Sequence, residues 1–153
     1  MGNKLWRTDP ADFARLDAEY GPFTIDAAAS DADTLVSARY CTELTDGRWA
    51  GHYRAGDRVF CNPPYTGLYK WLAVADQTSR ELADCSWLLI LPVSTDTRWF
   101  HQFVWDERRH RHRDAVELSL PAGRMHFVDP TKSARDDPRA PSMVVRFLPR
   151  ELR

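Results

Sequence analysis

The sequence lacks the features that mark a membrane, secreted or disulfide-rich protein. No apolar run approaches the roughly 18 residues of a membrane-spanning helix, and the polar start at residues 1–4 lacks the apolar region of a signal peptide. The three cysteines, Cys41, Cys61 and Cys85, are far apart and form no Cys-x-x-Cys pair. We therefore expect a soluble, intracellular protein whose cysteines are reduced core residues.

Two further absences concern bound groups. His110 and His112 flank an arginine, and no second pair of metal ligands lies nearby in the sequence, so we expect no metal centre. The seven glycines form no Gly-x-Gly-x-x-Gly pattern, which is the usual dinucleotide-binding loop. What is present, 43% hydrophobic and 12% aromatic residues in a chain of 153, excludes a disordered protein and can bury a single core.

The charges are distributed unevenly along the chain. Residues 1–107 contain 10 Lys and Arg against 16 Asp and Glu, a balance of −6, whereas residues 108–153 contain 11 against 6, a balance of +5. An acidic N-terminal part and a basic C-terminal part of the chain suit a protein that binds a cationic cofactor at one end and a polyanion at the other. Chance segregation of surface charge is the alternative.

Residues 59–65, Val-Phe-Cys-Asn-Pro-Pro-Tyr, predict a strand that ends abruptly. Neither Pro63 nor Pro64 has an N–H to donate to a ladder, so the chain must leave the sheet, and Pro63 holds Asn62 extended. The result is a stiff loop at the carboxyl end of a strand, where α/β sheets bind ligands. The Asn62 amide and the backbone carbonyls of the loop can accept hydrogen bonds from the exocyclic amine of a nucleobase, and the Tyr65 ring offers the base a flat surface. A plain turn with Tyr65 at the edge of the core is the alternative.

The segment before this loop predicts a capped helix. Asp9 is a suitable N-cap, Pro10 suits the first helical position and Gly21 suits the end, which gives a helix over residues 10–20. A short strand at 23–25 follows.

The strand at 23–25 ends at Asp26, and a run of very small residues at 27–30 follows it. Small residues after a strand let a ligand approach the backbone closely, although an alanine run is equally a good helix start. Residues 31–58 are the least regular part. We expect a strand at 34–36 and packing of Trp49 under this segment.

The middle of the chain predicts β-α-β-α with short links. Apolar residues with helical period predict a helix from residue 68 to about residue 80. The continuous apolar run at 87–91 predicts a strand covered on both faces and ended by Pro92. Capping side chains at 94–97 then precede the apolar face of a second helix, at 99–104.

The last third of the chain predicts strands at 116–120, 124–128 and 142–148, with a basic loop at 107–113 before them and a polar loop at 129–141. Terminal strands after repeated βα units favour an antiparallel edge on a parallel sheet. The predicted fold class is therefore α/β.

The proline loop and its surroundings resemble a known family. Asn-Pro-Pro-Tyr after a strand resembles the catalytic motif of amino-group methyltransferases that use S-adenosylmethionine, and the order of the other segments resembles the phage-encoded DNA N-6-adenine methyltransferase (Dam) family. The matching segments cover most of the chain: residues 6–10, 16–23, 25–30, 59–65, 91–100, 123–127 and 141–147. The resemblance implies a reduced Rossmann-like class I methyltransferase sheet, mostly parallel with an antiparallel C-terminal edge. It also implies one methyltransferase domain over residues 1–153, without a separate target-recognition domain, in the cytoplasm of a bacterial or phage-infected host cell.

The resemblance also implies where the cofactor S-adenosylmethionine lies. Thr8 and Pro10, together with Asp26, Ala27 and Ala28, would surround its methionine part. This chain departs from the wider class in two ways: alanines stand where relatives usually have glycines, and Asp9 is inserted into a Thr-Pro pair.

The expected reaction is methyl transfer to the N-6 amino group of adenine in DNA, with residues 62–65, namely Asn62, Pro63, Pro64 and Tyr65, as the catalytic group. The Asn62 side-chain oxygen and the Pro63 carbonyl would accept the two amine hydrogens. Tyr65 would stack on a base extruded from the duplex. Arg98, Arg124 and the basic run 108–113 would contact phosphates.

Three alternatives remain at this point. Asn-Pro-Pro-Tyr also serves methyltransferases that act on an amino group of RNA or on a protein glutamine. A catalytically inactive DNA-binding protein of the same fold is the third.

Overall fold

The computed structural model describes residues 7–30, 34–36, 38–123, 125, 127–128, 135–136 and 141–153. Its elements in chain order are β1 (Arg7–Thr8), α1 (Pro10–Tyr20), β2 (Ile25–Asp26), the 3-10 turn η1 (Ala50–His52), β3 (Arg58–Cys61), α2 (Leu68–Glu81), β4 (Ser86–Pro92), the π-helical turn η2 (Phe100–Val104), β5 (Trp105–Asp106), β6 (Arg111–His112), β7 (Val116–Ser119), β8 (Phe127–Val128), β9 (Arg135–Asp136), β10 (Ser142–Phe147) and the 3-10 turn η3 (Arg150–Leu152).

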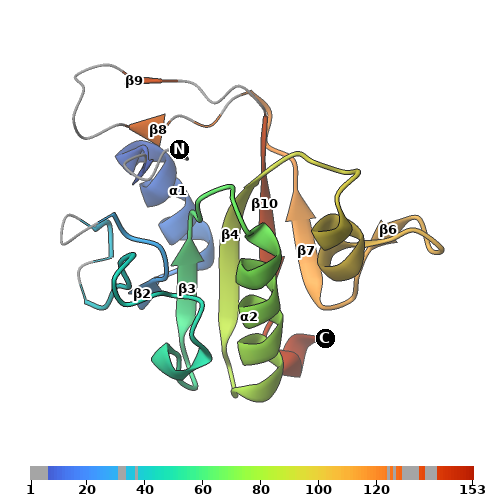
Figure 1. Cartoon of the computed structure of the whole chain (residues 1–153), viewed down its shortest axis with the longest axis horizontal. Helices are drawn as coiled ribbons and strands as arrows, with labels where there is room; N and C mark the ends of the chain where they lie inside the picture. The colour runs from blue at the N-terminus through green and yellow to red at the C-terminus, as the bar shows by residue number, and fades with distance from the viewer. Residues whose placement is uncertain are drawn as a thin grey trace.

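A five-stranded sheet with the order β2-β3-β4-β10-β7 forms the centre of the protein (Figure 1). The strands β2, β3 and β4 are parallel neighbours. β10 runs antiparallel to both β4 and β7, so four of the five strands point the same way. The predicted mixed α/β sheet, mostly parallel, is therefore confirmed. The antiparallel strand β10 is not at its edge but between β4 and β7, and of the strand predicted at 124–128 the described part is β8, which lies outside this sheet. β1, β8 and β9 form a small antiparallel sheet, and β5 and β6 form a hairpin.

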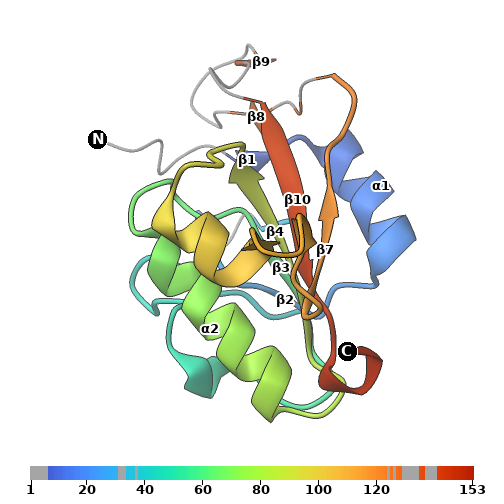
Figure 2. The ribbon, with the colours of Figure 1, turned by 90° about the vertical axis from the view of Figure 1, so that its right-hand side faces the viewer.

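The central strands are covered on both faces, as the apolar run in β4 predicted. Trp87, Leu89 and Leu91 belong to one core cluster together with residues of α2. Leu88 and Ile90 belong to a second cluster together with residues of α1. Figure 2 shows the two helices on opposite sides of the sheet. Burying each of these side chains contributes roughly 1.5–3 kcal/mol, which makes this strand a main source of stability.

Both long helices lie where the sequence predicted them. The Asp9 carboxylate accepts a hydrogen bond from the Ala11 N–H at 2.8 Å, and Pro10 is the first residue of α1. The cap satisfies one N–H that has no partner within the helix. α2 begins after Gly67, whose φ of 69° is the left-handed conformation that glycine adopts without strain.

Two expectations for residues 31–58 were wrong. Residues 34–36 form no strand, because the Thr34 hydroxyl donates to Asp26 and accepts from the Val36 N–H, which replaces ladder bonds with side-chain bonds. Trp49 does not pack under the segment. It is 63% exposed, and its ring lies against Gly51.

The structure defines two further segments in more detail. The second helix, expected at 99–104, is confirmed as a short helix over 98–104, α-helical at 98–99 and π-helical from Phe100 to Val104, and its predicted apolar side chains are mostly buried. The basic segment 107–113 is the turn and second strand of the β5–β6 hairpin. The strands predicted at 116–120 and 142–148 are confirmed as β7 and β10. Most of the predicted loop at 129–141 lies outside the described residues.

Candidate active site

The loop of Asn62, Pro63, Pro64 and Tyr65 leaves the sheet at the carboxyl end of β3, as predicted. β3 ends at Cys61 between the parallel strands β2 and β4, and α2 begins at Leu68. Pro63 is buried, Asn62 and Pro64 are partly buried, and Tyr65 is 44% exposed. The loop therefore stands at the rim of the sheet, with its aromatic residue reaching solvent.

The described residues leave two acceptors of this loop unused. Within the described part of the chain, neither the Asn62 side chain nor the Pro63 carbonyl takes part in a hydrogen bond. Val59 and Cys61 pack in the core cluster with α2, and Phe60 packs in the cluster with α1. Because side chains alternate along a strand, Asn62 is the next position on the α1 side.

Asp26 lies on the same rim, one strand away. It pairs with Phe60 in the parallel β2–β3 ladder, and the Ala27 N–H donates to the Phe60 carbonyl at 2.9 Å. Since β2 ends at Asp26 and β3 at Cys61, the acid and the proline loop leave adjacent strands at their carboxyl ends. The structure thus brings together two segments that are 36 positions apart in the sequence.

The Asp26 carboxylate is buried but well bonded. It is 6% exposed, and it accepts hydrogen bonds from the Ala28 N–H at 3.1 Å and the Thr34 hydroxyl at 3.0 Å. Burial raises the pKa of Asp26 to about 6, and these two hydrogen bonds oppose the rise. The carboxylate is consequently ionised at neutral pH, and its two hydrogen bonds offset only part of the free-energy cost of burying its charge.

The small residues after Asp26 are enclosed by the segment that follows. Ala27 is fully buried, and the Ala29 N–H donates to the Cys41 carbonyl at 2.9 Å. A Cβ on Gly47 would lie 1.9 Å from the Ala27 carbonyl oxygen. The backbone of Gly47 thus lies close to the loop after Asp26, and the predicted close approach of a ligand to this loop stays a prediction.

Thr8 and Pro10, the other predicted cofactor residues, differ in their surroundings. Thr8 is 1% exposed, and its hydroxyl has no hydrogen-bond partner among the described residues. Pro10 is exposed at the first turn of α1. Thr8 pairs with Phe127, which packs in the same cluster as Phe60. Figures 1 and 2 show the start of α1 and β8 at the end of the sheet where β3 and β4 terminate.

The predicted phosphate-contacting residues that the structure describes lie in two separate places. The Arg98 side chain is exposed and lies over the ring of Tyr69, in the first turn of α2, at 5.1 Å. It is therefore close to the end of the proline loop. Arg124 lies outside the described residues. The basic hairpin flanks β7, at the edge of the sheet opposite β2 (Figure 1).

Half of the arginines of the hairpin already have an acidic partner. Asp114 binds Arg109 at 2.9 Å and Arg111 at 2.6 Å. Arg113 donates to the His101 carbonyl. Among the described contacts, the Arg108 side chain has none, so it is the best-placed free cation of the run.

Comparison with known proteins assigns the family. The model of the family described as DNA N-6-adenine-methyltransferase (Dam) matches residues 2–153. The chain belongs to the Dam family. A DNA N-6-adenine-methyltransferase of Escherichia phage T1 is 25% identical to it over 159 residues, which cover 97% of this chain. The chain spans 63% of the length of that phage relative. No solved structure matches the chain.

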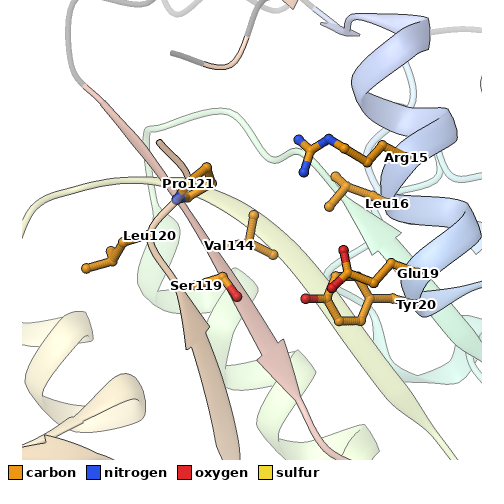
Figure 3. Close-up of a pocket in the computed structure, with 8 residues that line it drawn as sticks. All are labelled: Arg15, Leu16, Glu19, Tyr20, Ser119, Leu120, Pro121 and Val144. Carbon is orange, nitrogen blue, oxygen red and sulfur yellow. The ribbon is translucent and has the colours of Figure 1, made fainter. Parts of the chain in front are cut away.

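A groove elsewhere on this Dam-family protein contains none of the predicted site residues. It has a volume of about 310 Å³ and lies between α1 and the ends of β7 and β10 (Figure 3). Its lining is Arg15, Leu16, Glu19, Tyr20, Ser119, Leu120, Pro121 and Val144. In Figure 3, Ser119 and Tyr20 point toward one another across it.

Three residues around the candidate site were not found from the sequence. The Thr34 hydroxyl donates a hydrogen bond to the Asp26 carboxylate. Gly47 has no side chain that would collide with the Ala27 carbonyl, in the loop after Asp26. Ser142 is a buried residue at the start of β10. Thr34 and Gly47 lie in the segment without periodicity, and Ser142 looks like an ordinary strand residue. Only the Pro-Ser junction that begins β10 is a signal in the sequence.

The described helices of the protein include none that is both long and apolar enough to cross a membrane.

Proposed function

We propose that this protein transfers the methyl group of S-adenosylmethionine to the exocyclic N-6 amino group of adenine in DNA. The observation that carries the proposal is the pair of unengaged acceptors at Asn62 and Pro63, on the same rim as the buried Asp26 carboxylate. The names of the family and of the phage T1 relative support it. The sheet order also supports a reduced Rossmann-like class I methyltransferase fold, with the antiparallel β10 inserted beside the parallel strands.

The loop addresses the main chemical difficulty of the reaction. The lone pair of the adenine amine is delocalised into the ring, so the amine is a poor nucleophile. The Asn62 oxygen and the Pro63 carbonyl would accept its two hydrogens and favour a tetrahedral nitrogen with a localised lone pair. Because the two prolines fix the backbone, these acceptors would need little reorganisation when the base arrives.

The residues present fit a cofactor with a cationic amino acid part. S-adenosylmethionine supplies an electrophilic methyl group on a sulfonium, beside an ammonium group. The ionised Asp26 carboxylate would attract that positive charge. The Thr8 hydroxyl, buried and without a partner among the described residues, would find one in a bound polar group. Pro10, Ala27 and Ala28 would complete the surroundings.

The place of one further acid in the sheet suits contact with the ribose of the cofactor. Tyr40 forms a parallel bridge with Asp26, which adds a short sixth strand position beside β2. Glu43 follows this bridge at the same edge, 17 positions after Asp26. In nucleotide-binding α/β sheets, an acid about 20 residues after the first loop binds ribose hydroxyls. We assign that role to Glu43.

The adenine must leave the duplex to reach the loop. Extrusion costs a few kcal/mol, and stacking on an aromatic side chain returns roughly 1–3 kcal/mol. Tyr65 suits that contact, because it is 44% exposed at the end of the loop. Among the predicted phosphate contacts that the structure describes, Arg98 lies nearest to Tyr65, whereas Arg108 lies in the hairpin beside β7.

The test is methyl transfer from labelled S-adenosylmethionine to DNA, to RNA and to a glutamine-containing protein in parallel. We expect label in DNA alone, recovered as N-6-methyladenine. Label only in RNA or protein would replace the proposed substrate. Absence of S-adenosylhomocysteine binding in calorimetry, together with no transfer to any substrate, would indicate an inactive DNA-binding protein.

The DNA contacts are tested by the salt dependence of binding. The logarithm of affinity for DNA should fall with the logarithm of salt concentration, because each phosphate contact releases counterions. Arg98→Ala should reduce that slope by about one contact. Arg109→Ala is the matched control, since Arg109 is paired with Asp114, and it should change the slope less. Equal slopes for Arg98→Ala and wild type would remove Arg98 from the interface.

A further inference from the structure

Arg98 differs from the other described arginines that lie over an aromatic ring. There are three such pairs in the described part of the chain: Arg48 with Trp71, Arg98 with Tyr69 and Arg146 with Tyr20. Arg48 also binds the Asp46 carboxylate at 2.7 Å, and Arg146 binds Glu117 at 2.9 Å. Arg98 has neither a carboxylate nor a carbonyl partner among the described contacts, so its N–H donors are unused.

An acid close to Arg98 in the sequence leaves these donors unused as well. Asp96 is exposed two positions earlier, and the described contacts include no ion pair between the two side chains. A guanidinium that lies over a ring binds it through its flat face, which leaves the N–H donors at its edge for an acceptor such as phosphate. An ion pair with Asp96 would occupy the same donors.

The Tyr69 ring is itself held in place by the core. Tyr69 is the second residue of α2, and it packs with Phe103 of η2 against the core cluster on the α2 face of the sheet. The two rings meet at 64°, with their centroids 5.2 Å apart. A fixed ring restricts the guanidinium above it, so the long arginine side chain loses less conformational freedom when it binds DNA.

This pair lies close to the proline loop. Tyr69 follows the last residue of the loop by four positions, and Arg98 lies in the segment that follows the carboxyl end of β4. Figure 2 shows the helical turn η2 beside α2, and the two elements are in contact. When an adenosine is swung out of the duplex, the phosphates on either side of it stay next to the pocket that receives the base. One of them is the natural partner for a cation at this place.

We propose that Tyr69 is a positioning residue that holds the Arg98 guanidinium ready to bind a phosphate next to the extruded adenosine. This inference rests on the proposed function and adds to it the ring that orients one of its DNA contacts. Tyr69 acts only through Arg98 and does not touch the reacting atoms. Because the contact holds the strand equally before and during methyl transfer, its loss should raise the KM for DNA and leave kcat nearly unchanged.

A double-mutant cycle on DNA affinity, measured by fluorescence anisotropy with S-adenosylhomocysteine bound, tests the pair. Arg98→Ala should weaken binding about tenfold, since a hydrogen bond from a charged group is lost. Tyr69→Leu should weaken it roughly two- to fivefold, the value of an exposed cation–π contact. In the Arg98→Ala background the same change should cost nothing further, because the ring then has no guanidinium to hold. Tyr69→Phe, which keeps a ring, should bind DNA as wild type does.

Tyr20→Leu is the matched control. It removes the ring under Arg146, which is on the α1 side and is paired with Glu117, and it should leave DNA affinity unchanged. An equal loss from Tyr69→Leu with and without Arg98 would mean that the ring serves only the packing of α2, and this would overturn the proposal. Wild-type affinity in Tyr69→Leu would overturn it too.

Ethylation interference locates the phosphate. In duplex DNA with randomly ethylated phosphates, the positions at which ethylation prevents binding of wild type but not of Arg98→Ala should adjoin the methylated adenosine. Positions away from that adenosine would overturn the assignment. If wild type methylates adenine but the cycle shows no coupling between Tyr69 and Arg98, this inference fails and the proposed function stands. If wild type methylates no adenine in DNA, both fail.

Discussion

The buried Asp26 carboxylate should make the protein less stable than its asparagine variant at neutral pH. The pKa of Asp26 is about 6 in the folded protein, against an ordinary value of 3.8. Between these values the folded state binds more protons than the unfolded state, so the stability contributed by Asp26 falls as pH rises from about 4 to 6. Above pH 6 the full penalty for the buried charge, about 3 kcal/mol, is present.

Asp26→Asn removes the charge and keeps most of the hydrogen bonding. The amide oxygen can still accept from the Ala28 N–H, and the Thr34 hydroxyl can turn to accept from the amide nitrogen. We therefore expect the variant to match wild type near pH 4 and to exceed its free energy of unfolding by up to about 3 kcal/mol at pH 7.5. Urea unfolding at a series of pH values measures this difference.

The same substitution should weaken cofactor binding. A hydrogen bond to a charged group is worth about 1.5–3 kcal/mol, so the Kd of S-adenosylhomocysteine should rise at least about tenfold at pH 7.5. For wild type the affinity should fall as pH drops below 6, because Asp26 becomes protonated. A variant that is more stable than wild type but binds the cofactor less tightly would show that the Asp26 charge serves ligand binding and not stability.

Two results would refute this reasoning. Destabilisation of Asp26→Asn at pH 7.5 would mean that the carboxylate has a favourable partner in the folded protein, and unchanged cofactor affinity would place the cofactor elsewhere. Asp46→Asn is the matched control. Arg48 lowers the pKa of Asp46. Asp46 therefore makes a small contribution to stability that is present above its unfolded pKa and is lost as pH falls, which is the opposite pH dependence to that of Asp26. It should not alter cofactor binding.

Two other substitutions separate the parts of the site. Asn62→Ala should abolish methyl transfer and leave the Kd of S-adenosylhomocysteine within a few-fold, because the amide is assigned to the base; loss of cofactor binding would show that the loop serves the cofactor. Gly47→Ala should destabilise the protein by about 1–3 kcal/mol and weaken cofactor binding, since its Cβ would lie 1.9 Å from the Ala27 carbonyl oxygen. Gly51→Ala, whose Cβ meets only the exposed Trp49 ring, should do neither; equal losses in thermal melts of the two glycine variants would contradict this.

The elements that the sequence predicted correctly depend on local chemistry. Asp9 and Pro10 begin a helix because a capping carboxylate and a fixed φ act within one turn. The apolar run of β4 predicts a strand covered on both faces wherever that strand lies in the sheet. The two prolines after Asn62 end β3 because neither can donate to a ladder.

What only the tertiary structure decided is which of these segments meet. Strand pairing joins residues far apart in the chain, and periodicity carries no information about register. The sequence therefore did not show that Asp26 lies one strand from the end of β3, or that Ser142 pairs with Pro92 at the end of β4. The strand expected at 34–36 was wrong for the same reason, because the Thr34 hydroxyl bonds to Asp26, a partner eight residues earlier in the chain, and this bond leaves no signal in the sequence pattern.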